Sequence, residues 1–204
     1  MVHRARAVAA LVALTWLVPV VGRADTYEID ASHTAVQFAV RHMMISNVRG
    51  EFTKLTGKAV GDVANPTASV VEATIDTTSV DTRNAKRDEH LKGPDFLDAA
   101  KFPTITFKST KVEKAGEGAW KLTGDLTLHG VTKPVVLDVA NVTPPVKDPW
   151  GNTRIGAQAT TKINRQDFGI VFNKSLDGGG VLVGDEIAIT IDVEVMKKGD
   201  APAH

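Results

Sequence analysis

Apolar and polar residues alternate along most of the chain, and this period of two constrains the fold more than any other feature of the sequence. Such alternation is typical of β-strands that bury one face and expose the other to water. It predicts eight strands, at residues 34–43, 47–60, 68–76, 103–112, 118–129, 132–142, 153–163 and 186–196. Eight strands separated by turn residues predict an all-β antiparallel barrel or sandwich.

Six of the eight predicted strands, all but the second and the seventh, have one clearly apolar face. That face collects Val36, Phe38, Val40, Val71, Ala73, Ile75, Ile105, Phe107, Leu122, Leu126, Leu128, Val135, Leu137, Val139, Ile187, Ile189, Ile191, Val193 and Val195. The opposite face carries residues such as Glu72, Lys108, Asp138 and Asp192. A sheet that is polar on its outer face should wrap around its apolar side, which favours closure into a barrel.

The interior of such a barrel is not decided by the pattern. An eight-stranded barrel can be filled by its own side chains or can hold one small ligand. The inward set is aliphatic, and Gly124 falls on the same face, where it would leave space. A solid core and a cavity both remain open at this point.

Residues 81–96, DTRNAKRDEHLKGPDF, break the alternation and are rich in helix formers. We expect a short helical segment here, between strands 3 and 4 of the predicted barrel. Asp81 or Thr82 can cap its start, and Gly93-Pro94 should end it. Apolar residues just after it, Phe96, Leu97 and Phe102, are expected to dock the segment onto the sheet.

The first 24 residues have the pattern of a secretory signal peptide. Arg4 and Arg6 precede an apolar run over residues 7–21, and a small-residue cleavage signal ends at Ala24. The run is short for a membrane span, which needs about 20 residues. We therefore expect export to the periplasm, no transmembrane span after removal of the leader, and a single domain over residues 25–204.

Composition excludes several classes of protein. Removing the three arginines of the leader leaves 21 basic and 24 acidic residues, a net charge of −3 without a basic patch. Nucleic acid is therefore not an expected partner. The chain has no cysteine, which excludes disulfides, thiolate catalysis and zinc–cysteine sites. We also find no phosphate loop, metalloprotease motif or nucleophile elbow, so no catalytic residue, cofactor or metal is predicted.

Two motifs contain residues with chemical potential. His33 and His42 bracket the first predicted strand, but their odd spacing places them on opposite faces and argues against a pair of metal ligands within that segment. Barrel closure could still bring two of the scattered histidines together. In NRQDFGI, Arg165 could bind an anionic headgroup. The alternative is that Arg165 pairs with Asp167 and fixes the turn.

Four runs together resemble the YceI-like family of exported lipid-binding proteins: YEIDASHTAVQFAVRHMMISNVRGEF, HLKGPDFLDAAKFPTITFKS, LTGDLTLHGVTKPVVL and NRQDFGI. The resemblance extends from Tyr27 to about Val195. It implies an extended, lipocalin-like, eight-stranded barrel with a polyisoprenoid or other long-chain amphiphile in an apolar tunnel. By family motif, the resemblance covers Asp30, His33, Phe38, His42, Phe52, His90, Leu91, Phe107, Gly124, Leu126, Gly130, Arg165, Asp167, Phe168 and Gly169.

With this resemblance, face parity assigns eleven residues to the tunnel: Phe38, Val40, Ile75, Phe107, Gly124, Leu126, Leu128, Leu137, Phe168, Ile189 and Ile191. His33, His42, Arg165 and Asp167 are assigned to the headgroup or rim. The expected function is a non-enzymatic periplasmic carrier of an isoprenoid or fatty-type lipid. A lipid-modifying enzyme using His42 and a solid barrel that binds a partner are the alternatives. The oligomeric state stays open, a homodimer included.

Overall fold

A computed structural model describes residues 24–199, so residues 1–23 of the predicted signal peptide lie outside the described part. The strands are β1 (Asp25–Ile29), β2 (Ala35–His42), β3 (Ser46–Phe52), β4 (Leu55–Asp62), β5 (Asn65–Asp76), β6 (Val80–Asp81), β7 (Thr104–Gly116), β8 (Ala119–Leu128), β9 (Val131–Ala140), β10 (Val146–Lys147), β11 (Thr153–Asn164) and β12 (Val183–Lys197). The helices are α1 (Ala85–Lys92) and the 3₁₀ segments η1 (Thr77–Ser79) and η2 (Arg165–Phe168).

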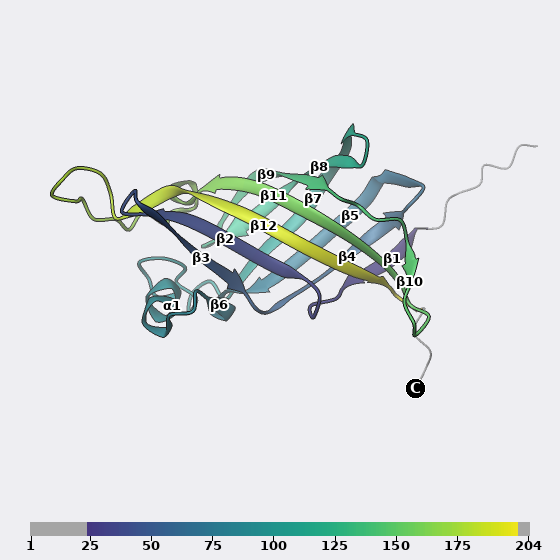
Figure 1. Ribbon diagram of the computed structural model, residues 1–204, viewed down its shortest axis with the longest axis horizontal. Helices are drawn as coiled ribbons and strands as arrows, with labels where there is room; N and C mark the ends of the chain where they lie inside the picture. Colours follow the sequence, from purple (N-terminus) through teal and green to yellow (C-terminus); the bar gives the residue numbers. More distant parts are fainter. Residues whose placement is uncertain (1–23, 200–204) are drawn as a thin grey trace, which may run out of the picture.

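The strands form a closed antiparallel barrel, as the polar outer face predicted (Figure 1). Closure is made by the pairing of β11 with β12 along nearly their whole length. On its other edge, β12 pairs with β1 and, further along, with β2. β4 pairs with β1, and β3 pairs with β2. β5 then pairs with β4, and β6 pairs with β3. Counting each of these successive pairs as one interrupted strand, the barrel has eight strands, and β10 is a short addition beside β11.

The observed strands differ from the predicted ones in two respects. The predicted strand 47–60 is divided into β3 and β4 at Thr53 and Lys54, whose backbone groups bond Ser79 and Asp76 instead. β1 was not predicted, because Tyr27 and Ile29 are the only apolar residues in its five positions and give too short an alternation. The division at Thr53 and Lys54 depends on tertiary hydrogen bonds, which a local pattern does not show.

The helix α1 forms within the predicted segment. It follows β5 and β6 and precedes β7, so it lies between the predicted strands 68–76 and 103–112, although in the observed numbering it comes after β5 and not between β3 and β4. Its N-cap is Asn84, whose side chain accepts from the Arg87 amide, rather than Asp81 or Thr82. Asp81 belongs to β6, and the Thr82 hydroxyl bonds Asp88 instead. The end at Lys92, before Gly93, agrees with the prediction. No helix within residues 24–199 is long and apolar enough to cross a bilayer.

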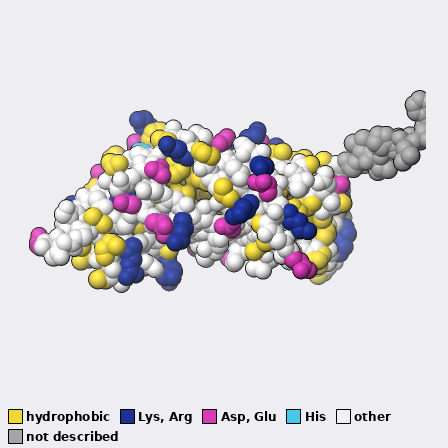
Figure 2. All heavy atoms as spheres, turned by 90° about the horizontal axis from the view of Figure 1, so that it is seen from above, with side chains coloured by type: hydrophobic (Ala, Val, Ile, Leu, Met, Phe, Trp, Pro, Cys, Tyr) yellow, Lys and Arg dark blue, Asp and Glu magenta, His cyan; other side chains and the backbone are white. Residues whose placement is uncertain are grey.

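The two faces of the sheet are sorted as the alternation predicted. Basic and acidic side chains intermingle on the outer surface (Figure 2). Inside, Leu122, Leu137 and Ala159 form one buried cluster. A second cluster joins Ile105, Leu128, Ile163, Phe168 and Ile170 near η2. Each buried side chain of the Leu or Ile type contributes about 1.5–3 kcal/mol to folding.

Candidate functional site

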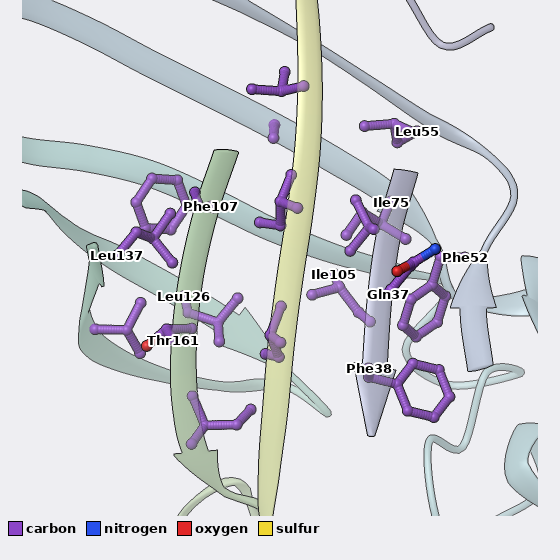
Figure 3. A pocket seen from close by; sticks show the side chains of 18 of the residues that line it. Gln37, Phe38, Phe52, Leu55, Ile75, Ile105, Phe107, Leu126, Leu137 and Thr161 are labelled. Atoms are coloured by element: carbon purple, nitrogen blue, oxygen red, sulfur yellow. The ribbon is translucent and has the colours of Figure 1, made fainter. Parts of the chain in front are cut away.

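A cavity of about 720 Å³ runs through the barrel, and its lining is almost entirely apolar. Its size lies within the range of about 300–1,000 Å³ that is usual for small-molecule sites. The labelled side chains in Figure 3 come from opposite parts of the wall: Phe107, Leu126 and Leu137 on one side, and Phe38, Phe52 and Ile75 on the other. The barrel is therefore hollow, and the solid-core alternative does not hold.

Most of the residues that the sequence assigned to a tunnel lie on the cavity wall. These are Phe38, Val40, Ile75, Phe107, Leu126, Leu128, Leu137, Ile189 and Ile191. The wall also contains residues that the analysis missed, because the seventh predicted strand did not sort by hydrophobicity. On β11, Ile155, Ala157, Ala159, Thr161 and Ile163 all line the cavity. The signal that could have identified the inward face of this strand is the alternation of small residues with polar ones along it.

Gly124 and Phe168 do not line the cavity, contrary to their assignment. A Cβ at Gly124 would lie 2.4 Å from Cζ of Phe107, so this glycine makes room for the ring and not for a ligand. The Phe168 side chain is 2% exposed and packs in the cluster beside η2. It contributes to the closed core near one end of the barrel.

α1 and the loop that follows η2 lie at the same end of the barrel (Figure 1), and both contribute residues to the cavity lining. His90 and Leu91 of α1 and Phe172 of the loop all border the cavity. The His90 ring meets the Phe172 ring edge-on, with centroids 5.2 Å apart. His90 also bonds Asp95 at 2.8 Å, which orients the imidazole. The predicted docking of the segment by Phe96 and Leu97 is observed, since both pack against the core.

Arg165 borders the cavity, but its guanidinium is committed to the protein. The residue is 3% exposed. Its Nη1 donates to the carbonyl oxygens of Ile170 (2.7 Å) and Phe172 (2.9 Å), and its Nε donates to that of Gly184 (3.0 Å). Its Nη2 pairs with Asp185 at 2.9 Å. Arg165 thus joins both ends of the loop after η2, and we interpret it as a structural residue of the cavity wall.

Asp167 is exposed and lies outside the cavity lining. The expected pair of Arg165 with Asp167 is replaced by the pair with Asp185, because Asp167 lies in η2 on the exposed side. Asp185 lies in β12, 20 positions from Arg165 along the chain. Its pairing with Arg165 depends on the loop closing back on itself, which the sequence does not encode locally.

His33 and His42 lie in different surroundings and do not form a pair. His42 is half-buried at the end of β2 and borders the cavity. His33 lies in the exposed turn before β2, where its Nδ1 is 2.8 Å from Asp30 Oδ2. This bond raises the pKa of His33. His33 is not among the residues that line the cavity.

Arg154 organises the opposite end of the barrel and was missed by the sequence analysis. Its Nε donates to Asp148 at 2.7 Å, and its Nη1 donates to Asp30 at 2.6 Å and to Glu194 at 2.5 Å. Asp30, His33 and Glu194 offer ligand atoms within 4.8 Å of one another, the one such group found in the described part of the chain. Arg154 already supplies the positive charge there, so we interpret the group as structural.

The comparisons with known proteins identify the family to which this hollow, apolar barrel belongs. The family model for the YceI-like domain matches residues 27–195, so this chain belongs to the YceI-like family. A UPF0312 protein of Ectopseudomonas mendocina is 45% identical over 166 residues, covering 80% of this chain and 86% of that protein. A UPF0312 protein of Vibrio cholerae is 43% identical over 155 residues, covering 75% and 82%.

Solved structures show the same architecture. The YceI protein of Campylobacter jejuni has a TM-score of 0.66 and 36% identity, covering 77% of this chain and 89% of that chain. A polyisoprenoid binding domain from Saccharophagus degradans has a TM-score of 0.61, covering 86% and 98%. At 16% identity, that second likeness concerns the fold alone.

Proposed function

We propose that this chain is a non-enzymatic carrier that holds a polyisoprenoid or another long-chain amphiphile in the barrel cavity. The observation that carries the proposal is the continuous apolar lining of the 720 Å³ cavity. Each methylene-sized group moved from water into such a lining contributes about 0.8 kcal/mol. A few isoprene units therefore reach the free energy of micromolar binding, about −8 kcal/mol, before the cost of ordering the chain.

The family supports the same kind of ligand. A structural neighbour from Saccharophagus degradans is described as a polyisoprenoid binding domain, and it shares the closed barrel. The N-terminal pattern of residues 1–24 supports export, and we place the carrier in the periplasm. We propose no catalytic residue: His42, the imidazole considered for such a role, borders a wall made mostly of hydrocarbon.

Extraction of the purified chain with organic solvent, followed by mass spectrometry of the extract, tests the proposal. We expect one predominant long-chain lipid at close to one molecule per chain. The control is the same extraction of the chain unfolded and washed before extraction, which should release almost none. An extract of wild-type protein with no lipid, together with no uptake of added geranylgeraniol, would refute the carrier function.

A further inference from the structure

Most of the exposed apolar side chains in the described part of the chain gather at the two ends of the barrel, which Figure 1 shows at α1 and at β10. The α1 end carries Met43, Met44, Ile45 and Val171, and the β10 end carries Val63, Val142, Val146 and Trp150. Among these eight residues, only Val63 and Val142 also line the cavity. At the β10 end, the cavity therefore reaches the outer surface between apolar side chains.

One side of this opening follows the edge of β11. The Thr143 amide donates to the carbonyl oxygen of Gly156 at 2.9 Å, and the Thr143 hydroxyl accepts from the Gly156 amide at 2.9 Å. Further along the same edge, Val146 pairs with Arg154 in the short ladder of β10 with β11. The segment from Val142 to β10 thus connects the cavity opening with the turn that contains Trp150.

The other side of the opening is formed where β5 leaves β7. The two strands pair from Glu72 to Asp76 of β5, whereas the Val71 amide donates to the Ser109 hydroxyl at 2.8 Å. The half of β5 that comes before this bond leads back to the turn at Val63. This half also contributes Pro66 to the cavity lining, so the barrel wall is open to the cavity on this side.

The turn that carries Trp150 is held around one carboxylate. Asp148, whose side chain is 8% exposed, accepts from the amides of Trp150 and Asn152, both at 2.9 Å. Its second oxygen accepts from Asn152 Nδ2 at 2.8 Å and from Arg154 Nε at 2.7 Å. Trp150 itself is 71% exposed. Because the turn is already ordered, burying this ring against a partner costs little further backbone entropy.

The two ends of the barrel differ in charge. The exposed residues that line the cavity at the α1 end include Arg41, His90 and Lys174. At the β10 end, Lys197 pairs with Asp25 at 2.6 Å and Lys198 pairs with Glu28 at 2.9 Å. The β10 end therefore combines an apolar opening with charges that are paired, which suits contact with hydrocarbon better than contact with a charged macromolecule.

We propose that the β10 end docks on the surface of a lipid bilayer, with Val146 and Trp150 inserted into the interface. The lipid then passes between the bilayer and the cavity beside Val63 and Val142 and is not exposed to water on the way. Tryptophan suits this place because its ring is apolar and its N–H can bond a headgroup, and it is enriched at membrane–water interfaces. The inference rests on the carrier function proposed above and adds the partner that supplies or receives the lipid.

Flotation of the purified chain with phosphatidylcholine vesicles tests the docking. Wild-type protein should float with the vesicles, equally at low and high salt, because the contact is apolar. Val146→Ser/Trp150→Ser should weaken the binding about tenfold or more, since large apolar side chains no longer leave water. The matched control is Met44→Ser/Ile45→Ser at the α1 end, whose residues are 51% and 74% exposed against 57% and 71% for Val146 and Trp150. This control should bind as wild type.

Uptake of geranylgeraniol separates docking from ligand binding. Val146→Ser/Trp150→Ser should take up the lipid more slowly than wild type from vesicles, and should bind it equally well when it is added in ethanol. Wild-type protein that does not float, or a loss of flotation in the α1-end control alone, would overturn the inference. Self-association that disappears in Val146→Ser/Trp150→Ser, without vesicle binding by wild type, would assign the surface to a second copy and also overturn it. Failure of wild type to bind geranylgeraniol added in ethanol would instead refute the carrier itself.

Discussion

Gly124 on β8 lies directly beneath the ring of Phe107 on β7. A Cβ at position 124 would fall 2.4 Å from Cζ of Phe107 and 2.6 Å from the carbonyl oxygen of Lys108. The ring can turn away, but the backbone oxygen cannot. Gly124 therefore leaves the space that the ring of Phe107, a residue of the cavity wall, occupies.

Gly124→Ala should destabilise the chain by about 1–3 kcal/mol, the usual cost of overpacking. Urea unfolding followed by circular dichroism measures the change. Gly178→Ala is the matched control, because a Cβ there meets nothing within 4 Å. A stability of Gly124→Ala equal to that of the control would show that the contact is relieved without cost.

Arg165→Gln should lower the free energy of unfolding by about 1–3 kcal/mol, because buried carbonyl oxygens lose their donors. We expect the binding of geranylgeranyl phosphate and of geranylgeraniol to weaken equally. Asp167→Asn, two residues away and exposed, should change stability by less than about 0.5 kcal/mol. Selective loss of phosphate-lipid binding in Arg165→Gln at unchanged stability would restore Arg165 as a headgroup residue.

Asp30 should make stability depend on pH in the acidic range. Hydrogen bonds from Ser32, then from His33 and Arg154, hold the pKa of its carboxyl well below the ordinary value. The resulting stabilisation is complete above the unfolded pKa of about 4 and is lost as the pH falls towards the lower folded value. His33 acts in the opposite direction: its pKa is raised, so its contribution is present when it is protonated and is lost as the pH rises through that raised value.

Asp30→Asn should therefore be less stable than wild type at about pH 7, and the difference should shrink towards about pH 3. Urea midpoints across this range provide the measurement. Asp125→Asn, an exposed carboxylate on the outer face of β8, serves as the control. A constant difference between Asp30→Asn and wild type at every pH would contradict a role for the ionised carboxylate.

His42→Gln distinguishes a carrier from an enzyme. Glutamine keeps a donor and an acceptor, so we expect lipid occupancy to change only modestly. If His42 were a general base, its loss would reduce turnover by about 10²–10⁴-fold. Occupancy and release of phosphate from geranylgeranyl phosphate are measured side by side. Turnover by wild type that disappears in His42→Gln while lipid still binds would contradict the carrier.

The barrel could be predicted from the sequence because the pattern that specifies it lies within each strand. Alternation along each strand determines which face is buried, and Phe38, Leu126 and Ile189 lie inside as their parity requires. The positions at which strands are interrupted do not follow from local sequence. Thr53 and Lys54 interrupt a predicted strand because their backbones pair with residues more than 20 positions away.

The partners of the polar groups around the cavity could not be predicted from the sequence, because they are distant along the chain. Arg165 was singled out correctly as chemically distinctive, but its true partner Asp185 is brought to it by a loop of about 20 residues. Charges gathered by closure leave no periodic signal along the chain.

The central claim is that the barrel holds a lipid in its cavity, and Leu126→Trp tests it most directly. Leu126 lies on the cavity wall, so a larger ring there should fill space that a lipid otherwise occupies. The control Asp125→Trp places the same ring on the exposed outer face of the same strand.

The measurement is native mass spectrometry of each folded chain with added geranylgeraniol. We expect one lipid per chain in wild type and in Asp125→Trp, and strongly reduced occupancy in Leu126→Trp at little cost in stability. Unchanged occupancy in Leu126→Trp, or a loss of about 1–3 kcal/mol with no effect on lipid, would instead indicate a tightly packed interior and contradict the account.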